Sequence, residues 1–80
     1  MSKTEIMSPL PGIFYRRPSP DSPPFKNDGD SVVSADVIGL VEVMKSFHQV
    51  VAGVDGAQIR FLLEDGDAVM AGQALAEVQA

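Results

Sequence analysis

The chain has 80 residues, no cysteine and a formal net charge of −5, with only 6 basic residues. This composition excludes a disulfide framework and a Cys-based metal site, and it argues against nucleic acid as a partner, because phosphates require clustered Lys and Arg. No apolar run approaches the about 20 residues that cross a bilayer, and the start lacks the apolar segment of a signal peptide, so we expect one small, soluble, cytoplasmic domain without a membrane anchor.

The N-terminal part combines a polar start with two short stretches of strand character. Residues 1–5 are polar and are expected to be frayed, so we predict a single domain over residues 6–80. Residues 6–10 and 12–16 are expected to be extended, and Pro9 and Pro11 mark a bend or a sheet edge where no ladder donor is needed.

A proline-rich segment follows, with four of the chain's six prolines between Arg17 and Asn27. Proline fixes φ and removes a hydrogen-bond donor, which argues against a helix or a central strand here. We predict a stiffened, irregular loop in which Phe25 is an apolar anchor. A disordered linker is the alternative.

The segment from Gly39 to Val51 consists of two apolar arms around an interruption at Met44 and Lys45. Both arms are rich in residues that pack on a pleated surface, so we predict a hairpin with Met44 and Lys45 at the two turn positions. Such turns prefer Asn-Gly, because both positions need φ > 0. A local rule broken at an exposed tip indicates that the side chains there are used; the plain alternative is a solvated lysine.

The sequence contains an internal repeat, because Asp28-Gly-Asp-Ser-Val32 recurs as Asp65-Gly-Asp-Ala-Val69. Gly12 and Gly56 also correspond, and the interval from Gly12 to the first element is seven residues longer, which identifies the proline-rich loop as an insertion. Asp-Gly is a turn dipeptide, so we expect both elements to be turns and not metal sites. The repeat maps Lys45 onto the chain ends, so its hairpin and the termini should lie at opposite ends of the molecule.

Two blocks of the sequence resemble those of a known family. Glu42-Val43-Met44-Lys45 is similar to the Glu-Ala-Met-Lys signature of biotin carboxyl carrier proteins, which belong to the biotin/lipoyl attachment domain family. Ser8-Pro-Leu-Pro-Gly-Ile-Phe-Tyr-Arg16, followed by Pro18-Ser-Pro-Asp21, resembles the opening of the carrier domain of bacterial and plastid acetyl-CoA carboxylase. The resemblance covers residues 6–79.

We therefore predict an all-β fold, a flattened barrel or sandwich of two antiparallel four-stranded sheets with quasi-twofold symmetry. The resemblance implies the biotinyl-domain type of this fold, a barrel-sandwich hybrid also called a hammerhead. It identifies the insertion, at about residues 17–25, as the thumb loop of the acetyl-CoA carboxylase type of carrier.

The resemblance also implies a carrier without catalytic residues or a metal. Lys45 would be the covalent attachment site for biotin, added by a biotin protein ligase that recognises Glu42, Val43, Met44 and Ser46. The thumb would contact the biotin through Arg17, Pro18, Ser19, Pro20 and Asp21. Biotin carboxylase would load carboxylate onto the arm, and a carboxyltransferase would pass it to acetyl-CoA, giving malonyl-CoA for fatty acid biosynthesis in lipid metabolism.

Three positions depart from the family pattern. Ser46 follows the lysine where an apolar residue is usual, Val43 replaces the commoner Ala, and Arg17 stands where the thumb usually has Thr. Two alternatives stay open: a lipoyl carrier, whose usual Asp-Lys-Ala centre is absent here, and an unmodified relative that acts as a binding or regulatory module. His48, the only histidine, is expected to have a surface or cross-strand role.

Overall fold

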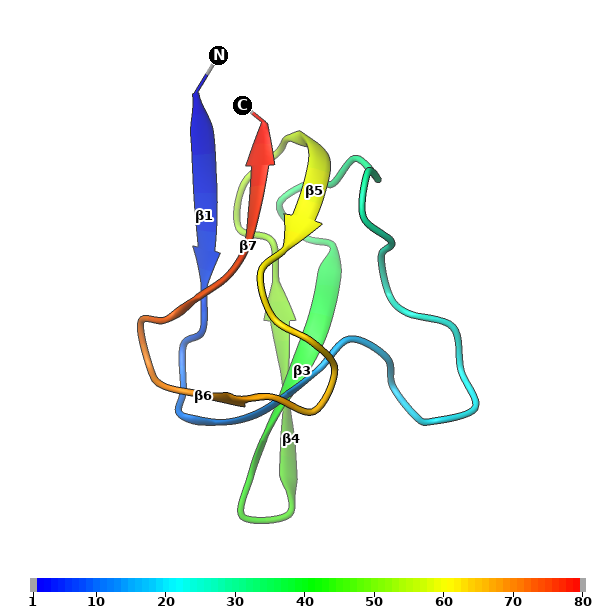
Figure 1. Cartoon of the computed structure of the whole chain (residues 1–80), viewed down its shortest axis with the longest axis vertical. Helices are drawn as coiled ribbons and strands as arrows, with labels where there is room; N and C mark the ends of the chain where they lie inside the picture. The colour runs from blue at the N-terminus through cyan, green and yellow to red at the C-terminus, as the bar shows by residue number, and fades with distance from the viewer. Residues whose placement is uncertain (1, 80) are drawn as a thin grey trace.

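The computed structural model describes residues 2–79, in which seven strands form two antiparallel sheets and no helix is present (Figure 1). The strands are β1 (Lys3–Met7), β2 (Gly12–Tyr15), β3 (Val37–Val43), β4 (Ser46–Val51), β5 (Ala57–Phe61), β6 (Ala68–Val69) and β7 (Ala74–Gln79). One sheet has the order β1-β7-β5 and the other β4-β3-β2-β6. The predicted all-β, two-sheet architecture is confirmed.

The two sheets differ in whether a fourth strand is formed at one edge. In the larger sheet β6 pairs with β2 through only two residues, Val69 opposite Gly12 and Ala68 opposite Ile13. The other sheet has at this position a single bridge between Val32 and Gly56, so it counts three strands where we expected four. The bridge is the repeat counterpart of the Gly12–Val69 pair, shortened because only Val32 meets the partner strand.

The repeat noted in the sequence is visible in matching hydrogen bonds. The amide of Gly66 donates to the carbonyl of Phe14 (2.7 Å), and the amide of Gly29 donates to the carbonyl of Ile59 (2.8 Å). Each Asp-Gly-Asp element therefore closes onto the strand of the other half. Quasi-twofold symmetry follows, because each half supplies the turn that the other half needs.

The first aspartate of each element uses its carboxylate in the same way. Asp65 Oδ1 accepts a hydrogen bond from the amide of Arg16 (2.7 Å), and Asp28 Oδ1 accepts one from the amide of Phe61 (2.9 Å). These bonds satisfy backbone donors just after β2 and at the end of β5, which would otherwise lack a partner. The structural interpretation of the Asp-Gly-Asp elements is confirmed.

The core lies between the sheets and is made of the inward-facing residues of both. Its largest fully buried side chains are Phe14, Ile38, Val41, Ile59, Leu75 and Val78. Phe14 and Phe61 come from opposite halves and stack with ring centroids 6.3 Å apart. The strands approach closely at Gly12 and Gly56: a Cβ on Gly12 would collide with the carbonyl oxygen of Glu42, and one on Gly56 would lie 2.8 Å from that of Gln79.

The expectation of a frayed N-terminus is wrong for residues 3–5. Lys3 lies opposite Gln79 and Glu5 opposite Glu77, so this stretch forms the first part of β1. Ile6 is buried in the core, and the backbone of the preceding residues bonds to β7. Because the side chains on the outward face of this strand are polar, the hydropathy of the sequence does not indicate a strand here. Residue 1 lies outside the described residues.

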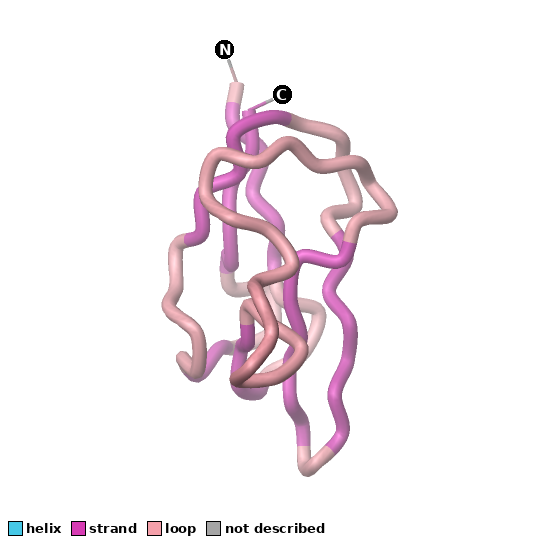
Figure 2. The backbone as a smooth tube through the Cα atoms, turned by 90° about the vertical axis from the view of Figure 1, so that its right-hand side faces the viewer, coloured by secondary structure: helices cyan, strands magenta, loops and turns pink. Residues whose placement is uncertain are grey.

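The hairpin of β3 and β4 projects from the end of the molecule opposite to that where β1 begins and β7 ends (Figure 1). The same arrangement is visible from the side in Figure 2, where the long loops cover one flank and the hairpin extends beyond them. The predicted separation of the Lys45 hairpin from the chain ends is confirmed.

Candidate functional site

The tip of the projecting hairpin is a two-residue turn. Val43 and Ser46 form the last cross-strand pair, and Met44 and Lys45 between them have φ angles of 49° and 70°. Both angles lie in the left-handed region, as a type I′ turn requires. The predicted turn positions are therefore confirmed, although neither residue is of the type that such a turn prefers.

The tip exposes its side chains to different degrees. Met44 is 92% exposed, and Lys45 and Ser46 are also exposed. Val43 is half-buried and packs against the core. The lysine is therefore held by a sheet that is anchored one residue before the turn, while the turn itself projects into solvent.

The hairpin has two faces, because successive side chains of a strand point to opposite sides. On the inner face, which continues into the core, Val43 is paired with Ser46. On the outer face, Glu42 is paired with Phe47. Ser46 thus lies on the inner side and Glu42 on the outer side, a separation that the linear motif does not reveal.

Tyr15 on β2 joins this outer face. Its hydroxyl donates a hydrogen bond to Glu42 Oε1 at 3.1 Å, and its ring lies 6.1 Å from that of Phe47, tilted by 51°. The pKa of Tyr15 is raised above its ordinary value, first because the phenol donates this bond to Glu42 and then through desolvation and nearby carboxylates. The three side chains form one connected group just below the lysine turn.

The proline-rich segment is a loop tied by hydrogen bonds. At its base the amide of Phe25 donates to the carbonyl of Arg16 (2.9 Å). At its tip the amide of Ser22 donates to the carbonyl of Ser19 (3.1 Å), and the two serine hydroxyls are 2.8 Å apart. Arg17 Nη1 donates to the carbonyl of Ser22 at 3.5 Å. This geometry favours the stiffened loop over the disordered linker.

Arg16 fastens the base of the loop to the body of the domain. Its guanidinium lies over the Phe61 ring, 4.1 Å from the centroid, and Nη2 donates to the carbonyl of Lys26 (3.4 Å). Lys26 in turn pairs with Asp36 at 3.1 Å. Both ends of the loop are therefore held by charged side chains that contact other parts of the chain.

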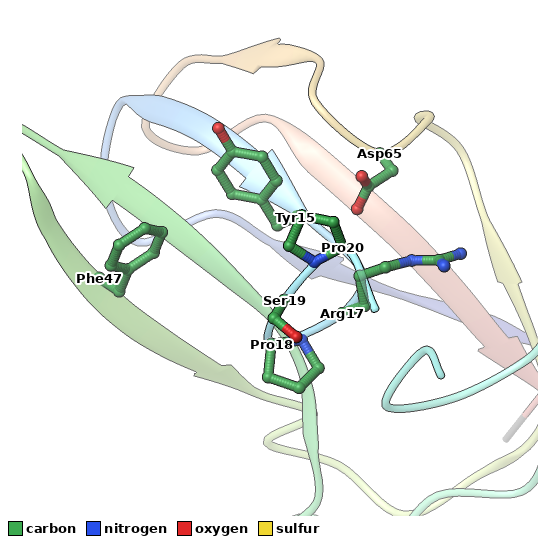
Figure 3. A pocket seen from close by; sticks show the side chains of 7 residues that line it. All are labelled: Tyr15, Arg17, Pro18, Ser19, Pro20, Phe47 and Asp65. Atoms are coloured by element: carbon green, nitrogen blue, oxygen red, sulfur yellow. The ribbon is translucent and has the colours of Figure 1, made fainter. Parts of the chain in front are cut away.

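A pocket of about 250 Å³ lies between the loop and the outer face of the hairpin (Figure 3). It is lined by Tyr15, Arg17, Pro18, Ser19, Pro20, Phe47 and Asp65. Four of the five predicted thumb residues take part, and Asp21 does not line it. Tyr15 and Phe47 were missed, although the alternation of side chains along a strand could have suggested Phe47, two positions after the lysine. Asp65 was predicted only as part of a turn, and no local pattern connects it with this pocket.

His48 is exposed on β4 and lies opposite Val41 across the hairpin. Within residues 2–79, no group of three or more His, Asp or Glu side chains is arranged to hold a metal ion, and no helix is long and apolar enough to cross a membrane. His48 therefore has the cross-strand position that we expected.

An all-β domain that presents one lysine on a tight turn, at the end far from its termini, defines the class of attachment domains that carry a group on a protruding hairpin. Residues 4–78 match the family model described as "Biotin-requiring enzyme". The chain belongs to this family of biotin/lipoyl attachment domains.

The chain is similar to proteins named biotin carboxyl carrier protein of acetyl-CoA carboxylase. It is 43% identical over 70 residues to the protein of Chlamydia pneumoniae, and this match covers 88% of this chain and 42% of that protein. It is 38% identical over 74 residues to the protein of Pyropia yezoensis, and this match covers 92% of this chain and 47% of that protein. It is also 38% identical over 64 residues to the biotin carboxyl carrier protein of acetyl-CoA carboxylase 2, chloroplastic, of Arabidopsis thaliana, and this match covers 80% of this chain and 25% of that protein. The chain thus spans less than half the length of these relatives.

Proposed function

We propose that this chain is the biotin carboxyl carrier domain of an acetyl-CoA carboxylase, with biotin attached to Lys45. The observation that carries the proposal is the turn itself. Lys45 has φ 70° in the two-residue turn that closes the hairpin, and both Lys45 and Met44 are exposed, so the lysine side chain is accessible to an approaching enzyme. A family match over residues 4–78 and relatives of that name support the assignment.

The domain acts as a substrate of its ligase and not as a catalyst. A lysine ammonium has no free electron pair, so it is not a nucleophile until a base has removed a proton. The nearest carboxylate along the strand, that of Glu42, is engaged by the Tyr15 hydroxyl on the outer face. A biotin protein ligase must therefore supply both activated biotin and the base. The lysine nitrogen then forms an amide bond to the biotinyl carbon, the bond from that carbon to the adenylate oxygen breaks and releases AMP, and the two protons that the ammonium gives up go to the base of the ligase and to water.

The exposed hairpin suits transfer between two active sites. A group on a long arm at the end of a small rigid domain is presented at high local concentration to each site in turn. The attached biotin would carry carboxylate from biotin carboxylase to carboxyltransferase, with acetyl-CoA as the acceptor and malonyl-CoA as the product for fatty acid synthesis. The carrier would work in the cytoplasm, without nucleic acid or membrane as a partner.

The pocket beside the hairpin supports a thumb contact to biotin. Its lining combines apolar surface from Phe47 and the prolines at 18 and 20 with the polar side chains of Ser19 and Asp65. A bicyclic ring with a ureido group needs such a mixture of apolar surface and hydrogen-bonding groups. Arg17, where the family usually has Thr, is held by the Ser22 carbonyl. We propose that Pro18, Ser19 and Pro20 provide this contact, with Arg17 supporting the loop and Asp21 outside the pocket.

The test is intact mass after incubation with biotin, ATP and a biotin protein ligase. The purified chain should gain one biotinyl group, and Lys45→Ala should gain none. Lys3→Ala is the matched control, because Lys3 is an exposed lysine that lies outside the sheet of the hairpin. Its ion pair, at 3.5 Å, is with Glu77 on the neighbouring strand β7. This control should be modified like the original chain.

A folded chain that gains no mass, with a ligase active on another carrier, would overturn the biotin proposal. Incubation with a lipoyl ligase and lipoate would then separate the lipoyl carrier from the unmodified binding module. A gain of mass that persists in Lys45→Ala would instead assign the attachment to another lysine.

A further inference from the structure

The outer face of the hairpin carries a connected group that the attachment motif alone does not account for. Glu42 and Phe47 are directly opposite each other, one pair below the Val43–Ser46 pair that closes the turn. Tyr15 reaches them from the neighbouring strand, with its hydroxyl on Glu42 and its ring against Phe47. Any protein that approaches the Lys45 amine from this side must cover these side chains.

The contact of Tyr15 with Glu42 restricts a side chain that would otherwise be mobile. A glutamate on a strand has three rotatable side-chain bonds, and ordering it on binding is unfavourable. Glu42 is half-buried, and the 3.1 Å bond holds its Oε1 before any partner arrives. A bond to an ionised acceptor is stronger than one between neutral groups, so it can hold the carboxylate in one orientation.

We infer that Tyr15 is a positioning residue that fixes the Glu42 carboxylate as part of the surface that the biotin protein ligase reads. The inference rests on the proposed function. The recognised surface is then the outer face, with the Glu42 carboxylate and the Phe47 ring next to each other. The ligase surface that fits it has a hydrogen-bond donor or a cation for the carboxylate beside an apolar contact for the ring.

The same geometry gives Ser46 a defined place. Ser46 lies opposite Val43 on the inner face, away from Glu42 and Phe47. An apolar side chain, Phe47, is therefore present on the outer face two positions after the lysine, even though the residue that directly follows Lys45 is polar. Recognition through the outer face accommodates the departure of Ser46 from the family pattern.

The experiment is a cycle of four proteins: the original chain, Tyr15→Phe, Glu42→Gln and the double variant. Tyr15→Phe keeps the ring against Phe47 and removes only the hydroxyl, so the KM of the ligase for the carrier should rise about three- to tenfold with little change in kcat. In the Glu42→Gln background the loss of the hydroxyl should have a much smaller effect. Glu77→Gln, the same change on the other sheet, is the matched control and should leave KM unchanged.

A spectroscopic measurement reports the contact without the ligase. Tyr15 is the only tyrosine and the chain has no tryptophan, so the ultraviolet absorbance of tyrosinate follows this one group. The bond to Glu42, with further contributions from burial and from Asp65, raises the pKa of Tyr15, and Glu42→Gln should move its titration toward the ordinary value of about 10. This readout keeps the inference testable even if Tyr15→Phe does not fold.

The outcomes separate the inference from the proposed function. If the original chain is not biotinylated at all, the proposed function fails. If the original chain is biotinylated and Tyr15→Phe has the same KM, or if its effect is equal with and without the Glu42 carboxylate, the positioning role is overturned. An unchanged tyrosine titration in Glu42→Gln would overturn it as well.

Discussion

Replacing Met44 with glycine should stabilise the domain, because it relieves backbone strain at the tip of the hairpin. Met44 has φ 49° and is 92% exposed, so its side chain contributes little buried area. A left-handed conformation costs a residue with a Cβ about 1 to 2 kcal/mol, whereas glycine loses about 0.5 to 1 kcal/mol more conformational entropy on folding. The difference predicts a gain of about 0.8 kcal/mol in the free energy of unfolding.

For a domain of 80 residues this gain corresponds to a rise of roughly 3 to 6 °C in Tm. Thermal and urea unfolding, followed by circular dichroism, would measure it. Met70→Gly is the matched control: Met70 is also exposed, at 69%, and has no positive φ. There glycine should lower stability by about 0.4 to 1 kcal/mol, because only the unfolded-state term remains.

A loss of stability in Met44→Gly equal to that in Met70→Gly would refute the strain argument. The stabilised variant also tests why the strain is kept. Strained residues persist where their side chains are used, so Met44→Gly should be a poorer substrate of the ligase than the original chain.

Three further changes test other parts of the molecule. Asp36→Asn removes a carboxylate that accepts a hydrogen bond from the Val33 amide (3.0 Å) and pairs with Lys26 (3.1 Å), contacts that lower the pKa of Asp36. The lowered pKa stabilises the fold at any pH above the ordinary pKa of about 3.9, and this contribution is lost as the pH falls through the pKa of the folded state. The Tm values of the original chain and of Asp36→Asn should therefore differ at neutral pH and converge in acid. A difference in Tm that persists in acid would contradict this reasoning. Phe14→Ala, at a fully buried ring, should lower the free energy of unfolding by about 3 to 5 kcal/mol in urea titrations, and a loss below about 1 kcal/mol would be incompatible with its place in the core. Ser46→Met, on the inner face, should leave kcat/KM of the ligase within about twofold of the original value; a large gain would show that the ligase reads this position.

The parts of the fold that could be predicted are those with a local pattern. Apolar arms around Met44 and Lys45 specified a hairpin and its turn, because side-chain alternation and turn length together fix the register. The recurring Asp-Gly-Asp elements predicted two related halves, and the extra length of the first half located the loop at residues 17–25. The strand at Lys3 to Glu5 was missed, since its pairing with β7 depends on residues more than 70 positions away.

The sequence by itself located the hairpin turn at Met44 and Lys45, the two related halves and the proline-rich insertion, because each depends on a pattern of neighbouring residues. Only the tertiary structure decided what surrounds the lysine. Asp65 reaches the pocket from the other half, and Tyr15 meets Glu42 and Phe47 because β2 pairs with β3, which pairs with β4. The faces of the hairpin were likewise settled by the sheet, which turns Ser46 inward and Phe47 outward. Such contacts join residues distant in sequence, so no local pattern records them.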